Sequence, residues 1–302
     1  MKQEQHNHQK RLVSVAVKLA KPTAYFTLLL LTYTSGYLSS PSATSLPSTT
    51  TPTIDELTNL PSQLDNFRVT SHCADPLPSE LVRQTILHRV YNGTSPFEGF
   101  PPAHVSSLLR RQRINGWGST GAVFDHLIQK VNPRTIIEVG TFLGASAIHM
   151  AGLTRELGLD TQILCIDDFR GWPGFRDRFK DIQMINGEVL LMYQFMQNLV
   201  SKNASESILP VPFSSGSALD KFCEWGVYGD LIEVDAGHDF LSAWSDINRA
   251  YRVLRPGGVI FGHDYFSSAD YRGVRRAVNL FARIHGLKIK LDGQHWVIDS
   301  TN

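Results

Sequence analysis

The sequence predicts a doubly wound α/β domain whose sheet has seven strands and is mostly parallel. One observation is the alternation, from about residue 134 onward, of short apolar runs with longer segments that carry apolar residues at helical spacing. Another is a closing pair of apolar runs at 287–291 and 295–298, separated by an Asp292-Gly293 turn. Alternating strands and helices form parallel sheets covered on both faces. The closing hairpin adds an antiparallel last strand.

The individual elements follow from local signals. The other expected strands are the short apolar runs at 134–139, 162–166, 207–212, 230–234 and 259–261. The expected helices, which begin near cap-type, Pro or Gly residues, cover 79–90, 102–113, 119–131, 144–157, 217–225, 241–254 and 271–285. We expect Arg255-Pro-Gly-Gly258 to form a turn that ends a helix. The insertion at 169–205 is too long for an ordinary connection, so we expect it to form a lid with a helix near 189–200.

Composition limits the function classes. The chain has 302 residues, of which 42% are hydrophobic and 19% charged, which is typical of a globular domain with attachments. A formal net charge of +1 and the lack of a basic stripe argue against nucleic acid as a partner. Cys73, Cys165 and Cys223 show no zinc-ligand spacing, and one disulfide among them is left open.

The first part of the chain predicts membrane attachment. Residues 1–21 form a basic tail, 22–38 a candidate transmembrane signal-anchor, 39–66 a stalk rich in Ser, Thr and Pro, and 67–302 the folded domain. Because the basic flank precedes the apolar run, we expect a single-pass type II protein with its domain in the lumen of the endoplasmic reticulum or Golgi. A cleaved signal peptide, which gives a secreted protein, and an organelle transit peptide are the alternatives. The glycosylation sequons at Asn92 and Asn203 agree with a lumenal domain.

The ends of the expected strands carry a candidate nucleoside site, because ligands of open α/β sheets bind there. Gly140 and Gly144 follow the first strand with G-x-x-x-G spacing, which is neither a dinucleotide fingerprint nor a phosphate loop. Asp167 ends the second strand about 20–25 residues further on, where a carboxylate can accept hydrogen bonds from a ribose. Asp168 follows it directly, and the sequence does not separate the roles of the two.

Four ordered motifs resemble those of class I S-adenosylmethionine-dependent methyltransferases. They are Glu138-Val-Gly-Thr-Phe-Leu-Gly144, Ile166-Asp167, Asp230-Leu-Ile-Glu-Val-Asp235 and Leu254-Arg-Pro-Gly-Gly-Val-Ile-Phe261, within a match that covers about residues 116–298. The resemblance implies the strand order 3-2-1-4-5-7-6. It also implies cofactor contacts from Glu138, Gly140, Thr141, Gly144, Ser146, Asp167 at the ribose, Ser217 and Ala218 at the adenine, and Trp117.

Two clusters follow the fourth and fifth strands and should lie side by side, namely Asp235-Ala-Gly-His238-Asp239 and Gly262-His263-Asp264-Tyr265. The arrangement is similar to metal-dependent O-methyltransferases, and the resemblance implies a metal held by Asp235, His263 and Asp264, with His238 and Asp235 as catalytic residues. Two carboxylates suit Mg²⁺. His263 stands where those relatives have an acidic residue, so another divalent cation such as zinc, or no metal, is also open.

These residues predict an O-methyltransferase that acts on a small molecule or a glycan, with or without a metal ion. A non-methylating relative of the hydroxylase type and a binding-only pseudoenzyme of the same fold are the alternatives. An NAD dehydrogenase is unlike this chain because the glycine spacing differs. The acceptor is left open, and so is the oligomeric state, with a homo-oligomer among the options.

Overall fold

The structure, a computed structural model, describes residues 72–172 and 174–301. The basic tail at 1–21, the candidate anchor at 22–38 and the stalk at 39–66 lie outside the described residues, and they stay predictions. Among the residues that are described, no helix combines the length and the apolar character that crossing a membrane requires.

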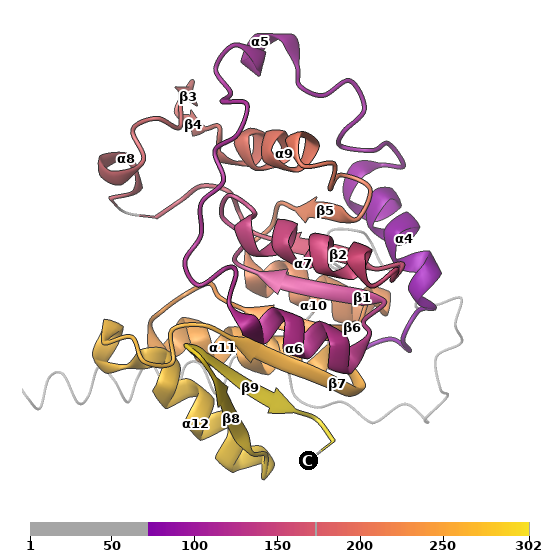
Figure 1. Cartoon of the computed structure of the whole chain (residues 1–302), viewed down its shortest axis with the longest axis vertical. Coiled ribbons are helices and arrows are strands. Elements are labelled where there is room, and N and C mark those ends of the chain that lie inside the picture. The colour runs from indigo at the N-terminus through magenta and orange to yellow at the C-terminus, as the bar shows by residue number, and fades with distance from the viewer. Residues whose placement is uncertain (1–71, 173, 302) are drawn as a thin grey trace, which may run out of the picture. The chain divides into compact units, whose positions relative to one another are not determined.

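The central sheet has seven strands in the order β5-β2-β1-β6-β7-β9-β8 (Figure 1). The strands are β1 (Thr135–Val139), β2 (Gln162–Ile166), β5 (Ile208–Val211), β6 (Gly229–Val234), β7 (Leu254–Gly262), β8 (Ile289–Asp292) and β9 (His295–Asp299). Numbered by their sequence within this sheet, the strands follow the order 3-2-1-4-5-7-6. β9 runs in the direction opposite to the other six strands, since it is antiparallel to both β7 and β8. The predicted fold class and strand order are therefore confirmed.

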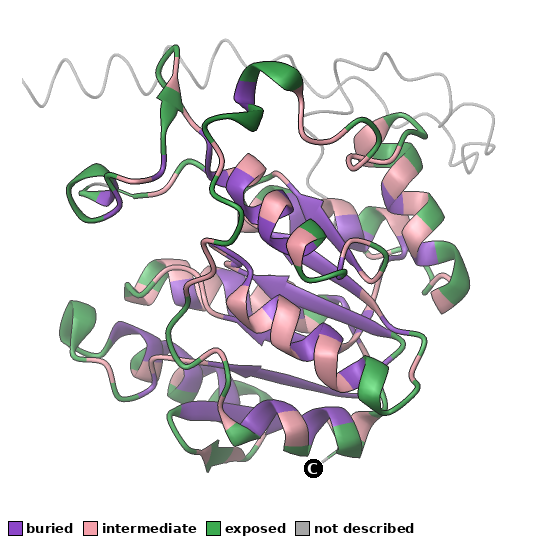
Figure 2. Ribbon diagram, turned by 45° about the horizontal axis from the view of Figure 1, so that its top comes forward, coloured by how far each residue is buried: buried purple, intermediate pink, exposed green. Residues whose placement is uncertain are grey.

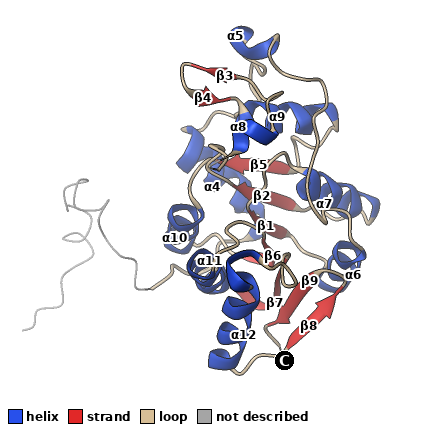
Figure 3. Ribbon diagram, turned by 90° about the vertical axis from the view of Figure 1, so that its left-hand side faces the viewer, coloured by secondary structure: helices blue, strands red, loops and turns tan. Residues whose placement is uncertain are grey.

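Helices cover both faces of the sheet (Figure 3). One face carries α4 (Ser79–Tyr91), α10 (Ser215–Trp225), α11 (Phe240–Arg252) and α12 (Gly273–His285), and the other α6 (Ala122–Val131), α7 (Ala145–Glu156) and α9 (Leu191–Ser201). Apart from the edge strand β8, the strands of this sheet are mostly buried between these layers (Figure 2). Every residue of β1 and β9 is buried, as apolar runs covered on both faces require.

The insertion after β2 contains α8 (Phe175–Arg178), a small hairpin of β3 (Met184–Ile185) and β4 (Glu188–Val189), and α9. Figure 1 shows α8 and the hairpin at the edge of the sheet where the arrowhead of β1 lies. The expected helix near 189–200 is confirmed by α9, whose residues Leu191, Phe195 and Met196 are buried. The insertion thus lies at the carboxyl ends of the parallel strands.

The helix predicted for 102–113 is wrong over most of its length, because only α5 (Ala103–Ser106) forms there. The backbone beyond it is bonded to amide side chains of α9 instead of to itself. Gln194 accepts from the backbone N–H of Arg110 at 2.9 Å, and Asn198 accepts from that of Arg113 at 2.8 Å. Both amides also donate to the carbonyl oxygens of the same two residues. These four bonds replace helical ones and hold the segment extended across α9.

Two turns also differ from expectation. Residues 255–258 belong to β7, where a register shift against β6 accommodates them, so they do not form a separate turn. Gly257 adopts a φ of +83°, which allows this irregularity inside a strand. In the closing hairpin Asp292 pairs with His295, so the two turn residues are Gly293 and Gln294.

A disulfide joins Cys73 to Cys223 of α10, and Cys165 is free and buried. The segment around Cys73 is bonded along its length to the same region, since Ala74 N–H donates to the Cys223 carbonyl and Leu77 N–H to that of Gly226. Arg255 also donates to the Leu77 carbonyl at 2.7 Å. The chain before α4 is therefore fastened to α10 and the start of β6.

Candidate functional site

The turn after β1 can be made only with glycine at its first position. Gly140 has a φ of +90°, and a Cβ atom there would lie 2.2 Å from the carbonyl oxygen of Asp235. Gly144 has a φ of +79° at the start of α7, and Phe142 between them also has a positive φ of 51°. The turn after β1 therefore lies directly against the end of β6. This agrees with the expectation that the strand ends form one ligand site.

Buried oxygen atoms lie beside this turn. Glu138 is fully buried at the end of β1 and accepts a hydrogen bond from the hydroxyl of Ser146, and burial raises the pKa of its carboxyl. Its second carboxyl oxygen and the hydroxyl of buried Thr141 have no hydrogen-bond partner among the described residues.

The structure separates the two acidic residues after β2. Asp167 accepts from the backbone N–H of Phe142 at 2.9 Å and from that of Phe169 at 2.7 Å, so it links the turn after β1 to its own loop. Burial raises the pKa of its carboxyl. Asp168 is exposed and accepts from the backbone N–H of Arg170. The sequence showed both carboxylates and could not show this difference in surroundings.

The expected adenine-side residues differ from each other. Ser214 caps α10 by accepting from the backbone N–H of Ser217, which is exposed. Ala218 is fully buried in the core, so its side chain packs within the protein. The two neighbouring positions that the resemblance paired therefore face different surroundings.

An aromatic cluster covers the turn after β1. Trp117 stacks on Phe142 with ring centres 5.5 Å apart, and Trp172, Phe175 and Phe179 of the insertion pack against Phe142. Arg178 lies over the Trp117 ring at 5.1 Å. The insertion thus contacts both Trp117 and the turn, as expected of a lid. Two of its arginines are engaged inside the protein, since Arg178 lies on the Trp117 ring and Arg176 donates to the Ile182 carbonyl.

The two polar clusters meet at the ends of β6 and β7, as predicted. Candidate ligand atoms of Asp235, His263 and Asp264 all lie within 4.8 Å of one another. The Nε2 atom of His238 lies 2.9 Å from a carboxylate oxygen of Asp264, and Nδ1 of His263 lies 3.4 Å from the same oxygen. Asp264 has a φ of 60°, an uncommon conformation for an aspartate that aims its side chain at both imidazoles.

Electrostatic coupling follows from these contacts. The hydrogen bond to Asp264 raises the pKa of both His238 and His263, and the same bonds hold the pKa of Asp264 well below its usual range. Burial raises the pKa of Asp235 to about 7. The cluster therefore combines a deprotonated carboxylate with two imidazoles that titrate above their ordinary range.

Other residues of this region have structural roles or were missed. Asp239, and not His238, caps α11 by accepting from the backbone N–H of Ser242 at 2.9 Å. Tyr265 is buried, and its hydroxyl donates to Asn279, so it belongs to the core. His295 was missed, although it lies against His263 with ring centres 4.9 Å apart. Only the antiparallel pairing of β9 with β7 brings it there, and the sequence carries no local signal for that contact.

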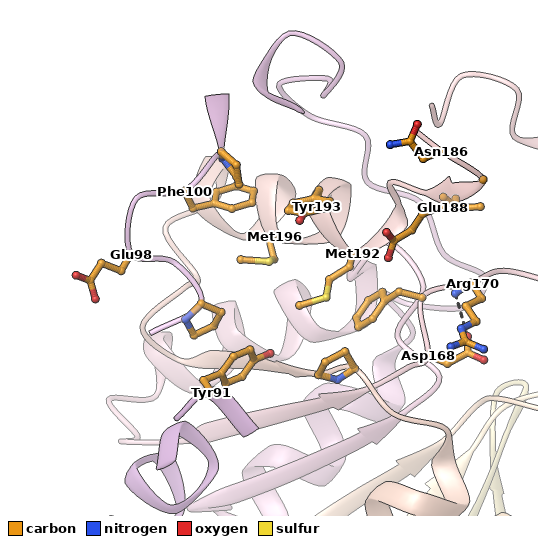
Figure 4. A pocket seen from close by; sticks show the side chains of 16 residues that line it. Tyr91, Glu98, Phe100, Asp168, Arg170, Asn186, Glu188, Met192, Tyr193 and Met196 are labelled. Carbon is orange, nitrogen blue, oxygen red and sulfur yellow. Dashed lines mark hydrogen bonds between the residues drawn. The ribbon is translucent and has the colours of Figure 1, made fainter. Parts of the chain in front are cut away.

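A cavity of about 820 Å³ lies beside the edge strand β5 (Figure 4). Met192, Tyr193 and Met196 of α9 line it together with Tyr91 of α4, and Asp168 and Arg170 lie at one side. Its described lining residues do not include the cluster at Asp235 and Asp264. Around that cluster there is a much smaller cavity, of about 10 Å³, lined by His238, His263 and Trp296 among others.

The strand order, the glycine turn and the carboxylates at successive strand ends define the fold of class I methyltransferases. Residues 137–265 match the model of a family described as a methyltransferase domain. Over residues 137–265 the chain therefore resembles a methyltransferase domain, and its strand order is that of the class I fold. A comparison with curated proteins gives no match.

Two methyltransferases are among the solved structures that are similar to this chain. One is the O-methyltransferase from Bacillus cereus in complex with SAH, which is 15% identical, with 74% of this chain and 99% of that chain covered and a TM-score of 0.43. The other is the O-methyltransferase TomG from Streptomyces achromogenes, involved in tomaymycin synthesis, in complex with SAM. It is 15% identical, with 67% of this chain and 92% of that chain covered and a TM-score of 0.44.

Proposed function

We propose that this chain transfers the methyl group of S-adenosylmethionine to a hydroxyl oxygen of a small molecule, with His238 as the base. The observation that carries the proposal is the pair formed by His238 and Asp264, whose atoms approach to 2.9 Å beside Asp235 and the glycine turn. Methyl transfer to a hydroxyl needs a group that removes the hydroxyl proton. A histidine oriented by a carboxylate meets that need.

The contact with Asp264 determines which nitrogen of His238 acts. Nε2 bonds to the carboxylate, so in the neutral imidazole the proton stays on Nε2 and Nδ1 keeps its lone pair. Nδ1 then takes the hydroxyl proton as the acceptor oxygen bonds to the methyl carbon. His238 is half exposed, with 51% of its side chain accessible, so an acceptor can reach it. Asp264 acts by orienting the ring and stabilising its protonated form.

We propose that the cofactor lies over the turn after β1. When bound, S-adenosylmethionine supplies the sulfonium methyl group. The proposed contacts are Glu138, Gly140, Thr141, Gly144, Ser146, Asp167, Ser217, Ala218 and Trp117. The positive φ of Gly140 and the bond from Phe142 N–H to Asp167 support this position, because they bring exposed backbone and a carboxylate to one rim. Trp117 and the lid aromatics would exclude water from the turn.

The residues at the ends of β6 and β7 also fit a divalent cation. Asp235 and Asp264 offer hard oxygen atoms, and Nδ1 of half-buried His263 lies 3.4 Å from an Asp264 oxygen, within the same group of candidate ligand atoms. We propose that these three residues would hold the ion. A bound Mg²⁺ would act as a Lewis acid toward the acceptor oxygen, and the imidazole also suits zinc or another transition metal.

We also propose that the domain works in a compartment outside the cytosol, attached through the anchor at 22–38, with a secreted or organellar form as the alternative. The disulfide between Cys73 and Cys223 supports an oxidising environment. The exposure of both sequon residues, Asn92 and Asn203, agrees with it.

The test compares two substitutions in the full chain. Asp167→Ala removes the link between the two cofactor-side loops, and we expect it to weaken S-adenosylhomocysteine binding at least about tenfold in calorimetry. His238→Ala should leave that affinity within about twofold and lower kcat by a factor on the order of 10²–10⁴, measured by transfer of labelled methyl.

His88→Ala is the matched control, because His88 is an exposed residue of α4. It should change neither quantity. If His238→Ala and Asp167→Ala lose binding equally, the roles assigned to them are wrong. If the unmodified chain methylates no hydroxyl compound across a broad panel while binding the cofactor, O-methyl transfer is wrong.

A further inference from the structure

Three large apolar side chains are exposed on the two segments that follow β6 and β7, namely the start of α11 and the loop at 264–272. Leu241 is 73% exposed, Phe266 is 49% exposed and Tyr271 is 89% exposed. We call these three residues the apolar platform. Exposed apolar side chains that gather at one place often mark a binding surface, whereas single ones need no explanation.

Several contacts join the start of α11 to the loop at 264–272. The carboxylate of Asp270 accepts from the backbone N–H of Phe240 at 2.8 Å, so the loop at 264–272 is bonded to the start of α11. Gly273 lies so close to this turn that a Cβ atom there would be 2.6 Å from the carbonyl oxygen of His238. Asp264 at the other end of the loop is bonded to His238 itself. The platform and the proposed base therefore share one rim.

The backbone of this loop holds Tyr271 outward. Asp270, Tyr271 and Arg272 follow one another with φ values of 45°, 49° and 66°, a left-handed run that side-chain-bearing residues rarely adopt. Asp270 is held there by its bond to Phe240 and by Arg276, whose guanidinium lies 3.2 Å from the carboxylate. In this conformation the Tyr271 ring meets almost no protein atoms.

Several charged side chains near the platform contact other groups of the protein. Arg275 lies over the buried Tyr265 ring at 5.2 Å, and Arg276 lies over Phe240 at 5.1 Å as well as pairing with Asp270. Asp239 is engaged as the cap of α11. The platform thus offers mainly apolar contact to a ligand, and the imidazole of His238 lies on the same rim.

We propose that Leu241, Phe266 and Tyr271 bind an aryl or alkyl group of the acceptor and thereby direct its hydroxyl to His238. The inference rests on the proposed function and narrows its substrate class to hydroxyl compounds that carry such a group, as opposed to free sugars. In the reaction the carbon–sulfur bond to the methyl breaks and a carbon–oxygen bond forms. The hydroxyl proton moves to Nδ1 of His238, and S-adenosylhomocysteine leaves.

The test uses three probes with the same sugar hydroxyls and different apolar groups, namely methyl, phenyl and hexyl β-D-glucoside. Their binding to the full chain saturated with S-adenosylhomocysteine is measured by calorimetry, so no turnover is needed. We expect the phenyl and hexyl probes to bind at least about tenfold more tightly than the methyl probe. Equal affinities, or no binding of any probe, would overturn the inference.

Substitutions locate the effect. Leu241→Ser and Tyr271→Ser should each remove most of the advantage of the phenyl and hexyl probes, while Tyr271→Phe should keep it. Ile284→Ser is the matched control, because Ile284 is 60% exposed near the far end of α12. Another surface binds the apolar group if Ile284→Ser lowers the affinity advantage of the phenyl and hexyl probes as much as the platform variants do. The same conclusion follows if the platform variants leave that advantage unchanged.

Separate readouts distinguish failure of this inference from failure of the proposed function. The affinity for S-adenosylhomocysteine should stay within about twofold in all four variants, because none of these residues contacts the turn after β1. Loss of the cofactor affinity in the unmodified chain contradicts methyl transfer itself. Intact cofactor binding with no preference for apolar probes contradicts only the platform.

Discussion

His238 and Asp264 lie in the loops that follow the neighbouring strands β6 and β7. They are 26 positions apart in the sequence, yet Nε2 of His238 lies 2.9 Å from a carboxylate oxygen of Asp264. The parallel pairing of β6 with β7 brings them together, since Val234 pairs with Gly262. Parallel strands deliver the residues that follow them to one rim. At the scale of single residues, the chemistry of the site therefore depends on this register.

The pH dependence of turnover tests the pair. The hydrogen bond from His238 to Asp264 raises the pKa of His238 above its ordinary 6.5. Because only the neutral imidazole can accept a proton, kcat should be low under acidic conditions and rise with pH through this raised pKa. Asp264→Asn removes the carboxylate, so the rise should move to lower pH while the maximal rate falls.

The measurement is kcat at saturating substrates from about pH 5.5 to 9, together with binding of S-adenosylhomocysteine at each pH as the control. A profile that is flat over this range, or one that does not move in Asp264→Asn, would show that His238 is not the base.

At the scale of elements, the segment before α4 shows how the chain is fastened. It is bonded to α10 and the start of β6 by backbone hydrogen bonds and by the disulfide between Cys73 and Cys223. The two cysteines are 150 positions apart, so the bond closes a long loop in the unfolded chain. A disulfide that closes a long loop removes much conformational entropy from the unfolded chain and so stabilises the folded state.

Removal of this disulfide should therefore destabilise the domain. We expect Cys73→Ser to lower the free energy of unfolding by about 2–5 kcal/mol, measured by denaturant titration of the oxidised full chain. The control is dithiothreitol, which should lower the stability of the unmodified chain to the same extent and leave the variant unchanged. A variant as stable as the oxidised protein would mean that the bond contributes nothing to folding.

The elements also show where prediction from sequence succeeds. The strands and most helices were predicted because apolar residues recur with the period of each element. The helix expected at 102–113 failed because Gln194 and Asn198 of α9, more than 80 positions away, take up its backbone groups. No local pattern can report a bond made by a distant side chain.

At the scale of the whole molecule, the disulfide and the two sequons bear on the proposed location of the domain. The disulfide and the exposed sequon residues agree with a lumenal domain behind an N-terminal anchor. Asn92 follows α4 and Asn203 follows α9, so both come before the edge strand β5 in the chain. Both are accessible to a glycosyltransferase.

Expression in a eukaryotic cell tests the location. If the domain enters the secretory lumen, peptide N-glycosidase F should increase the electrophoretic mobility of the protein, and Asn92→Gln and Asn203→Gln should each abolish one step of the shift. Gln84→Asn, which creates no sequon, is the matched control and should leave both steps in place. A protein that carries no glycan at either site would contradict the lumenal assignment.

The sequence by itself determined the α/β class and the candidate residues at the carboxyl ends of the strands, because periodicity and turn residues are local properties. The order of the strands came from the resemblance of its motifs to a known family, and the structure confirms that order. Only the tertiary structure decided that Asp167 and Asp168 differ in their surroundings, that Cys73 pairs with Cys223, and that His295 lies against His263. Each of these depends on which distant segments meet, and the energy of such contacts appears only once the chain is folded.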